Sequence, residues 1–250
     1  MEIYQIFLLI GAGMICGFIN TVAGGGSLIS LPILIFLGLP ANIANGTNRI
    51  ALIAQNIFAV TGFRRQGIQL FPFNLYLGVS ASFGAVIGAW FSAQIPAETF
   101  KQIIAVIMIG VVIVSLFNVG KTGLMDERIF GKYKTLSIIA FFFIGIYGGF
   151  IQIGIGFIMI AALSHINHLS LVKTNSVKVF VALIYSTAAI VIFIIEGQVN
   201  WVYGLTLAIG NSAGGWFASQ WSVKKGDRWI KRVVLISASV MAIKMLIDTF

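Results

Sequence analysis

Residues 17–49 read GFINTVAGGGSLISLPILIFLGLPANIANGTNR, and this stretch decides how the rest of the chain is interpreted. Three consecutive glycines at 24–26 interrupt a long apolar run. Glycine adopts backbone conformations that are closed to other residues, so the triplet predicts a sharp break in a helix. We expect Ser27 to cap a new helix that begins at Leu28. The unpaired amides and the positive dipole end of that helix favour an anion.

The broken helix predicts a binding site for a small anion, because irregular backbone inside a bilayer occurs only where protein or a water-filled cavity covers it. A sharp turn without a ligand is the alternative. The glycines are not followed by Lys-Ser/Thr at the spacing of a phosphate-binding P-loop, which excludes that motif.

The composition indicates an all-α polytopic membrane protein. The chain has 250 residues, of which 59% are hydrophobic and only 9% charged, and its mean hydropathy is +1.01. Soluble domains carry about 25% charged residues. Apolar runs of about 18 or more residues recur along the chain, each long enough to cross a bilayer. The N-terminus lacks a basic region and a cleavage site, so we expect the first run to be retained.

The net charge of +9 does not indicate a nucleic-acid partner, because the basic residues gather in or beside three short connections. The connections at 94–98 and 197–200 carry no basic residue. This asymmetry is the positive-inside pattern of the cytoplasmic membrane, with the basic connections inside. The residues that carry the pattern are Arg64, Arg65, Lys121, Arg128, Lys132, Lys134, Lys224, Lys225, Arg228, Lys231 and Arg232.

We expect two transmembrane repeats, 1–118 and 135–250, separated by a cytoplasmic connection at 119–134. Each repeat begins with a broken apolar unit and continues with three uninterrupted helices. The broken units are 3–39 and 135–166. The helices are 44–63, 71–93 and 98–118, then 174–195, 200–221 and 229–247.

The two halves resemble copies of one another. GVSASFGAVIGAWFSAQ at 78–94 aligns with GLTLAIGNSAGGWFASQ at 204–220, including Trp90 with Trp216. Upstream, the glycines at 24–26 lie opposite the Gly-Ile-Gly at 154–156. We expect the small residues of the aligned helices to serve close helix packing.

The positions of the basic connections make the two repeats inverted. Each broken unit must begin and end on one side, either as a re-entrant hairpin or as two short crossings. The three further crossings of the first repeat then give the second repeat the opposite orientation. Inverted repeats with broken helices that meet near the midplane are a recurring architecture of secondary transporters.

Two cations fall inside predicted helices at corresponding positions, Arg49 within TNR at 47–49 and Lys178 within SVK at 176–178. A charge at the bilayer centre costs about 2.5–3.5 kcal/mol or more, so such residues serve a function or extend to the membrane surface. The repeat favours a pair of cations that flank an anion path. Asn45 and several other polar residues add neutral hydrogen bonds, for which bonding between helices is the alternative. The candidate substrate-binding residues are Asn20, Thr21, Gly24, Gly25, Gly26, Ser27, Thr47, Asn48, Arg49, Gly154, Gly156, Asn175, Ser176 and Lys178.

Missing residue types narrow the function. All seven acidic residues fall in connections or at predicted membrane edges, so the membrane interior has no carboxylate for a proton relay or a cation site. The chain has no HExxH or GxSxG motif, and its single cysteine, Cys16, excludes an intrachain disulfide and a cysteine metal cluster. We therefore expect neither enzymatic activity nor a metal or other cofactor.

The segments GFINTVAGGGSLISLP and GLPANIANGTNR, with the degenerate second copy GGFIQIGIGF, resemble the sulfite-exporter TauE/SafE family of bacterial membrane permeases. The resemblance covers nearly the whole chain. It implies export or uptake of small sulfur-containing anions such as sulfite, thiosulfate or organosulfonates. Ile155 and Phe157 interrupt the second glycine cluster and depart from the family pattern.

The sequence therefore predicts a permease that moves a small anion, sulfur-containing by the resemblance, across the cytoplasmic membrane by alternating access. An anion channel and a non-transporting membrane assembly protein are the alternatives. The expected partners are the anion and the lipid bilayer, and a homodimer stays open.

Overall fold

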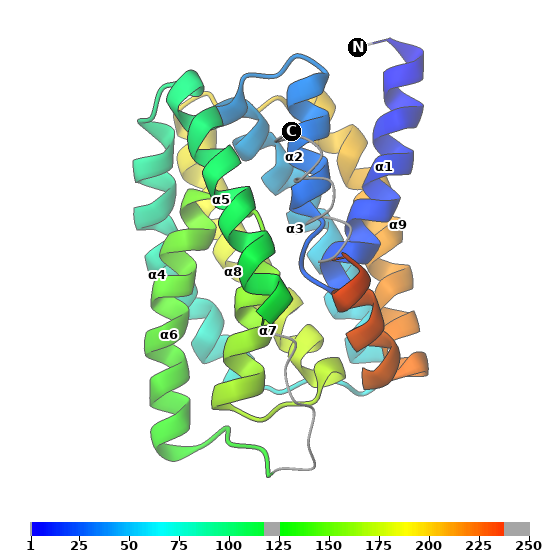
Figure 1. The fold of residues 1–250 in the computed structure, drawn as a ribbon, viewed down its shortest axis with the longest axis vertical. Coiled ribbons are helices and arrows are strands. Elements are labelled where there is room, and N and C mark those ends of the chain that lie inside the picture. Colours follow the sequence, from blue (N-terminus) through cyan, green and yellow to red (C-terminus); the bar gives the residue numbers. More distant parts are fainter. Residues whose placement is uncertain (1, 118–125, 238–250) are drawn as a thin grey trace.

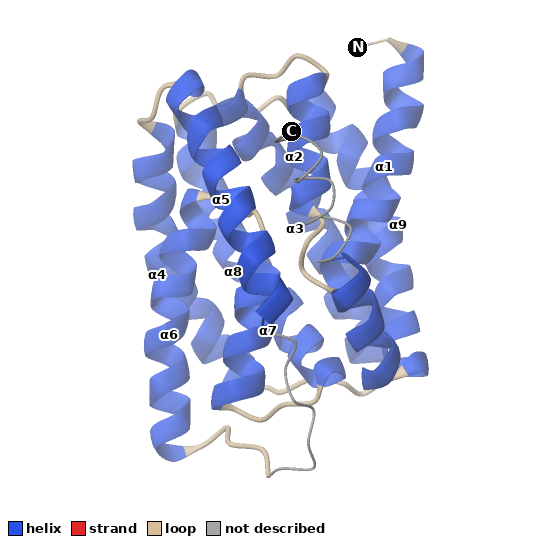
Figure 2. Cartoon of the chain, in the orientation of Figure 1, coloured by secondary structure: helices blue, strands red, loops and turns tan. Residues whose placement is uncertain are grey.

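The computed structural model describes residues 2–117 and 126–237, and the side chains of 2–107 and 126–237. All regular structure in these parts of the chain is helical (Figure 2). The predicted connection at 119–134 and the predicted helix at 229–247 fall partly outside the described residues. The helices are α1 (Ile3–Val22), α2 (Ser27–Phe36), α3 (Ala41–Arg65), α4 (Phe73–Ala93), α5 (Ala97–Phe117), α6 (Gly131–Phe150), α7 (Ile155–Ile166), α8 (Leu171–Ile195) and α9 (Trp201–Lys225), and residues 227–237 are also helical.

Two broken units form hairpins that enter the bundle from opposite ends (Figure 1). Helix α1 descends from the end that holds the N-terminus, the chain reverses at 23–26, and α2 returns to the same end. Helices α6 and α7 form the second hairpin from the other end, with the reversal at 151–154. Each hairpin therefore stops inside the bundle.

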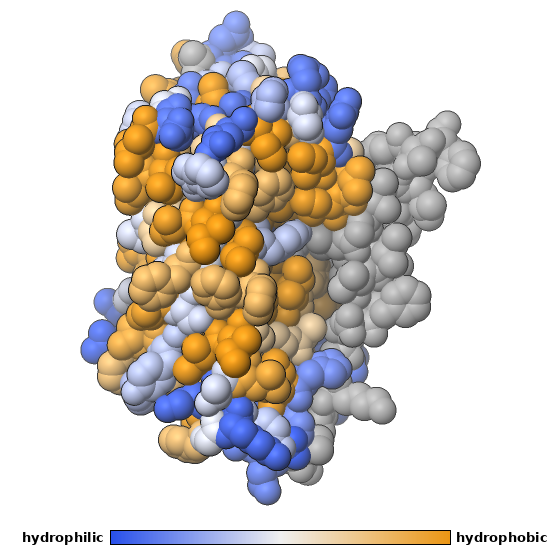
Figure 3. Space-filling view, turned by 90° about the vertical axis from the view of Figure 1, so that its left-hand side faces the viewer, coloured by the Kyte–Doolittle hydropathy of each residue, from blue (hydrophilic) through white to orange (hydrophobic). Residues whose placement is uncertain are grey.

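The surface of the bundle suits a bilayer. Four of the described helices, α1, α4, α6 and α8, are long and apolar enough to cross a membrane. On the face shown in Figure 3, hydrophobic residues cover the middle and hydrophilic residues gather at both ends. Helices α3 and α9 have 25 residues each and are long enough as well, but they are more polar. Their polar side chains, such as Asn48 and Asn211, are buried between helices.

Glycines bring two pairs of helices into close backbone contact. A Cβ at Gly84 or Gly88 of α4 would overlap the carbonyl oxygen of Phe142 or Ile146 in α6. A Cβ at Gly210 or Gly214 of α9 would likewise overlap the carbonyl oxygen of Ile10 or Met14 in α1. These are the glycines that the sequence alignment pairs, and the expectation that they serve close helix packing is confirmed.

The same correspondence holds in the reverse direction. Gly145 of α6 lies against the backbone of Ala81 in α4, as Gly13 of α1 lies against that of Leu207 in α9. The packing of α4 on α6 therefore matches the packing of α9 on α1, contact for contact. This supports the inverted repeat, which stays our interpretation.

Two helices, α8 and α6, start earlier than the sequence predicted. Helix α8 begins at Leu171 because the Ser170 hydroxyl accepts a hydrogen bond from the Lys173 amide at 3.3 Å. Helix α6 begins at Gly131, so that Lys132 and Lys134 lie on its first turn rather than in the connection. Lys134 extends over the Tyr76 ring, with Nζ 4.8 Å from the ring centroid.

Surface labelling tests the two ends of the bundle. In a Cys16→Ala background, cysteines at the exposed positions Gln69 and Phe130 should be shielded from an impermeant thiol reagent in intact cells. Cysteines at Glu98 and Glu196, at the opposite end, should react. Equal labelling of both pairs in intact cells, with full labelling of all four after permeabilisation, would contradict the orientation.

Candidate functional site

The tips of the two hairpins meet in the middle of the bundle, back to back at Gly24 and Gly156. Gly24 has a φ of +87°, in the left-handed region that favours glycine. A Cβ on Gly24 would overlap the Cα of Gly156, and a Cβ on Gly156 would overlap the Cα of Gly24. Both tips therefore require glycine for conformation or for space.

The first tip is held by α8, which belongs to the other half of the chain. The Lys178 ammonium donates to the carbonyl oxygens of Asn20 at 3.1 Å and Thr21 at 2.8 Å. The Asn175 amide donates to the next carbonyl, that of Val22, at 2.9 Å. The last three carbonyls of α1 are thus bound by α8. We call this group of contacts the α1 cap.

The second tip is held in the same way by α3. The Arg49 guanidinium donates to the carbonyl of Gly148 at 3.1 Å and to that of Gly149. Asn45 donates to the carbonyl of Phe150, the last residue of α6, at 3.0 Å. The last three carbonyls of α6 are thus bound by α3, and we call these contacts the α6 cap.

Two further contacts hold Arg49 in place. With its amide turned so that both groups are satisfied, Gln152 accepts from Nη1 at 3.1 Å and from Nε at 3.0 Å. The guanidinium also lies over the ring of Phe193, 4.6 Å from the ring centroid. Arg49 is fully buried and Lys178 is 4% exposed, so neither side chain extends to the membrane surface.

The caps explain how two cations are buried without a carboxylate. The carbonyl end of a helix carries the negative end of its dipole. A hydrogen bond to a charged group contributes about 1.5–3 kcal/mol, so two or three such bonds offset a burial cost of about 2.5–3.5 kcal/mol or more. The described acidic residues are Glu2, Glu98, Asp126, Glu127, Glu196 and Asp227, all at helix ends or in connections.

A small cavity of about 20 Å³ lies where the hairpin tips meet α3 and α8. That volume holds about one water molecule. Helix α2 starts at this cavity with Ser27, and Ile155 and Gly156 bring the start of α7 to it. Its polar lining consists of Asn20, Ser27, Asn56, Gln152, Lys178 and Tyr185.

The structure brings many of the predicted site residues together. Ser27, Asn20, Gly156 and Lys178 line the cavity, while Thr21, Gly24 and Asn175 contact lining residues or each other. Asn48 reaches the Ser27 hydroxyl at 3.5 Å, and Arg49 contacts the lining residue Gln152. Gly25, Gly26 and Gly154 form the two reversals themselves.

Two predicted site residues lie at the ends of the bundle instead. The Thr47 hydroxyl accepts from the Asn200 amide at 2.9 Å, and Ser176 donates to the Ile68 carbonyl at 2.8 Å. Each of these contacts fixes a connection between helices.

The predicted cap of α2 is wrong. Ser27 is the first residue of the helix, Gly26 occupies the cap position, and no side-chain cap is formed there. Without a side-chain cap, the first-turn amides bond to the backbone of the reversal, Leu28 to the Gly25 carbonyl at 3.1 Å and Ile29 to the Gly26 carbonyl at 3.0 Å.

The sequence analysis missed Gln55, Asn56, Gln152 and Tyr185. Gln55 connects the first tip to α3 and α9, since it bonds the side chains of Asn20 at 3.3 Å, Thr21 at 3.2 Å and Asn211 at 3.4 Å. The sequence did contain a signal for two of them, because Gln55 and Gln152 are polar residues within apolar runs. In the structure both are 1% exposed or less.

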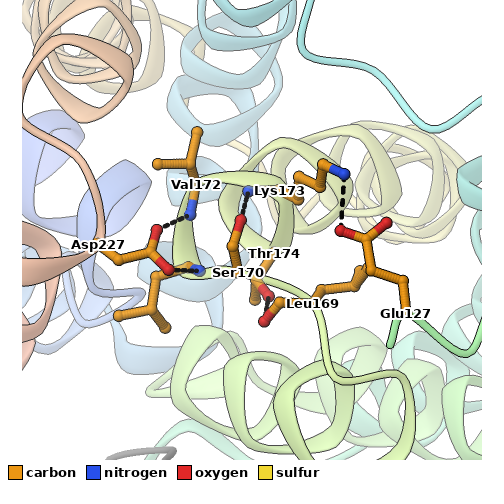
Figure 4. Close-up of polar contacts among 8 residues, drawn as sticks. Glu127, Leu169, Ser170, Val172, Lys173, Thr174 and Asp227 are labelled. Carbon is orange, nitrogen blue, oxygen red and sulfur yellow. Dashed lines mark hydrogen bonds and ion pairs between the residues drawn. The ribbon is translucent and has the colours of Figure 1, made fainter. Parts of the chain in front are cut away.

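The N-terminal end of α8 is fixed by residues outside the hairpins (Figure 4). The Asp227 carboxylate accepts from the amides of Leu171 at 2.9 Å and Val172 at 3.0 Å. Glu127 forms an ion pair with Lys173 at 2.6 Å. The helix that carries Asn175 and Lys178 is therefore anchored just before these two residues.

Comparison with known proteins identifies the family. The family model "Sulfite exporter TauE/SafE" matches residues 9–245. The chain belongs to the TauE/SafE family. TauE/SafE membership and the apolar helices make it a membrane transporter and a multi-pass protein of the cytoplasmic membrane.

Curated relatives match over nearly their whole length. "Probable membrane transporter protein YfcA" of Escherichia coli K12 is 28% identical over 97% of this chain and 90% of its own. "Probable membrane transporter protein ORF9" of Sinorhizobium sp. is 25% identical over 99% of this chain and 95% of its own. A "Probable membrane transporter protein" of Haemophilus influenzae is 25% identical over 96% and 94%. No solved structure is significantly similar to the chain.

Gly24→Ala should destabilise the protein, because alanine is strained at this φ and its Cβ overlaps Gly156. Gly38→Ala is the matched control, since Gly38 has a φ of +94° but nothing within 4 Å of an added Cβ. We expect Gly38→Ala to lower the thermal unfolding temperature slightly and Gly24→Ala to lower it several times more. Equal shifts in detergent-purified protein would show that the contact between the tips adds nothing beyond backbone strain.

Proposed function

We propose that this transporter moves a small anion, a sulfur oxyanion or an organosulfonate, across the cytoplasmic membrane by alternating access. The observation that carries the proposal is the charge at the cavity. Two helix starts and Lys178 lie at a cavity whose lining includes no acidic residue, and Arg49 is one contact away through Gln152. Positive helix ends and buried cationic side chains favour an anion as the ligand and disfavour a metal ion or another cation.

The lining also suits an oxyanion in its neutral groups. Ser27 and Tyr185 have hydroxyl donors, and Asn20, Asn56 and Gln152 have amide donors that can bond several oxygens at once. This donor-rich arrangement is typical of sites for small anions with three or four oxygens. The family description supports sulfite and chemically related anions as the first candidates.

The size of the cavity favours a carrier over a channel. A space of about 20 Å³ accepts one water molecule but not an anion of four or more heavy atoms. The anion can therefore enter only after the hairpin tips move. A carrier that opens to one side at a time requires this closed form, whereas an open pore does not.

Binding and flux measurements test the proposal. Sulfite, thiosulfate, sulfate or methanesulfonate should raise the thermal stability of the purified protein. Exchange of the counter-ion between sodium and potassium should not change it. Proteoliposomes should show saturable uptake that is accelerated by the same anion on the opposite side, as alternating access requires. Flux that rises linearly with concentration would indicate a channel, and absence of both stabilisation and flux would reject anion transport.

Neutralising the cations should weaken anion binding. A charge-assisted hydrogen bond contributes about 1.5–3 kcal/mol, so Lys178→Gln and Arg49→Gln should each reduce anion affinity roughly ten- to a hundredfold. Arg49→Lys should restore part of the loss, because a lysine supplies the charge but not the planar fork. Lys178 lies near the cytoplasmic start of its helix, so Lys178→Gln should act more strongly on anion presented from that side. Wild-type affinity in both neutral variants, with insertion verified, would place the anion elsewhere.

A further inference from the structure

All three N–H donors of Lys178 and four of the five of Arg49 are already occupied in this structure. A lysine ammonium has three N–H donors, and Lys178 has three acceptors in the carbonyls of Asn20 and Thr21 and the side-chain oxygen of Asn175, the last at 2.8 Å. An anion can bond to Lys178 only if at least one of these acceptors leaves.

Arg49 is in a similar position at the other tip. Of its five N–H donors, the carbonyls of Gly148 and Gly149 take two and Gln152 takes two more, which leaves one N–H of Nη2. An anion can use more than this one donor of Arg49 only if one of these acceptors leaves, so at both cations the carbonyl end of a hairpin competes with an external anion.

From this competition we propose that the anion and the hairpin tips are alternative ligands of the two cations. Binding of the anion at Lys178 releases the α1 cap, and binding at Arg49 releases the α6 cap. The inference rests on the proposed function, and it adds the event that couples anion binding to movement of the hairpins. The carbonyls stand in for the anion while the site is empty, so that neither cation is ever buried without a partner.

The anchoring of α8 determines which part moves. Asp227 and Glu127 hold the start of α8, two to four residues before Asn175. Besides the α1 cap, the tip of α1 is held by Gln55, which bonds the side chains of Asn20 and Thr21, and by packing against Gly156. Loss of the cap therefore loosens the tip while both anchors of α8 stay in place.

Asn175 is the positioning residue of the α1 cap. Its oxygen accepts from Lys178 while its amide donates to the Val22 carbonyl, so one side chain connects the cation and the tip. Its counterpart Asn45 donates to the Phe150 carbonyl and to the Ser92 hydroxyl at 3.2 Å. The Asn175 oxygen competes with the anion for the Lys178 ammonium. Removal of this oxygen should therefore tighten anion binding.

Two substitutions at Asn175 test this with opposite expected signs. Asn175→Ala removes one acceptor from Lys178 and one tie from the tip, and should tighten anion binding about tenfold while lowering the unfolding temperature of the anion-free protein. Asn175→Asp places a carboxylate against Lys178, and should weaken anion binding more than tenfold. The probe is whichever of sulfite, thiosulfate and methanesulfonate binds the wild type most tightly, measured by calorimetry.

A matched control separates these effects from general damage. Asn74 is also a buried asparagine, 3% exposed on α4, and belongs to neither cap, so Asn74→Ala should leave anion affinity unchanged. Weaker binding by Asn175→Ala would overturn the inference and make Asn175 a direct anion ligand. Absence of anion binding by the wild type would overturn the proposed function itself, and this inference with it.

Hydrogen exchange gives a second readout. The amides of Ala23 and Gly24 bond to the Ile19 carbonyl at 2.7 and 3.1 Å and end α1. Under this proposal the anion accelerates exchange in peptides that cover 19–25, whereas a ligand that simply fills the cavity slows it. Slower exchange at the tip in the presence of saturating anion would contradict release of the cap.

Discussion

The burial of two cations in an interior without a described carboxylate is the constraint on which this structure depends. Arg49 and Lys178 are each surrounded by protein, and a lone charge in such a place is costly. Ordinary ion pairs would solve the problem, but they would also neutralise the charge permanently. Carbonyls at a helix end solve it differently, because they stabilise the cation and leave the net positive charge in place.

This solution accounts for several features that otherwise look unrelated. A helix must end inside the bundle to present its last carbonyls to a buried cation, and both α1 and α6 end there. The carbonyls of Thr21 and Gly149 are bonded by residues from the opposite half, so the two halves hold each other. The contact of Gly24 with Gly156 then joins the two tips.

The sequence predicted the helices and the hairpin breaks well because their signals are local. Glycine triplets, apolar runs and paired glycines such as Gly84 and Gly210 report directly on turns and close packing. The special status of Arg49 and Lys178 was also visible, since charged residues are rare in membrane helices. Their partners were not visible, because they are backbone carbonyls, which every residue has. Gln55 and Gln152 escaped notice for a related reason, since their importance lies in contacts between helices distant along the chain.

The order of synthesis matters for the two caps, because each cap joins one half of the chain to the other. Gly148 follows Arg49 by 99 residues, whereas the carbonyls that bind Lys178 precede it by more than 150. When α8 leaves the ribosome its partners are already in the membrane, but α3 emerges long before α6 exists. Helix α3 is also absent from the described helices that are apolar enough to span a bilayer unaided. Arg49 therefore obtains the carbonyls that bind it in the folded protein only after α6 has been translated.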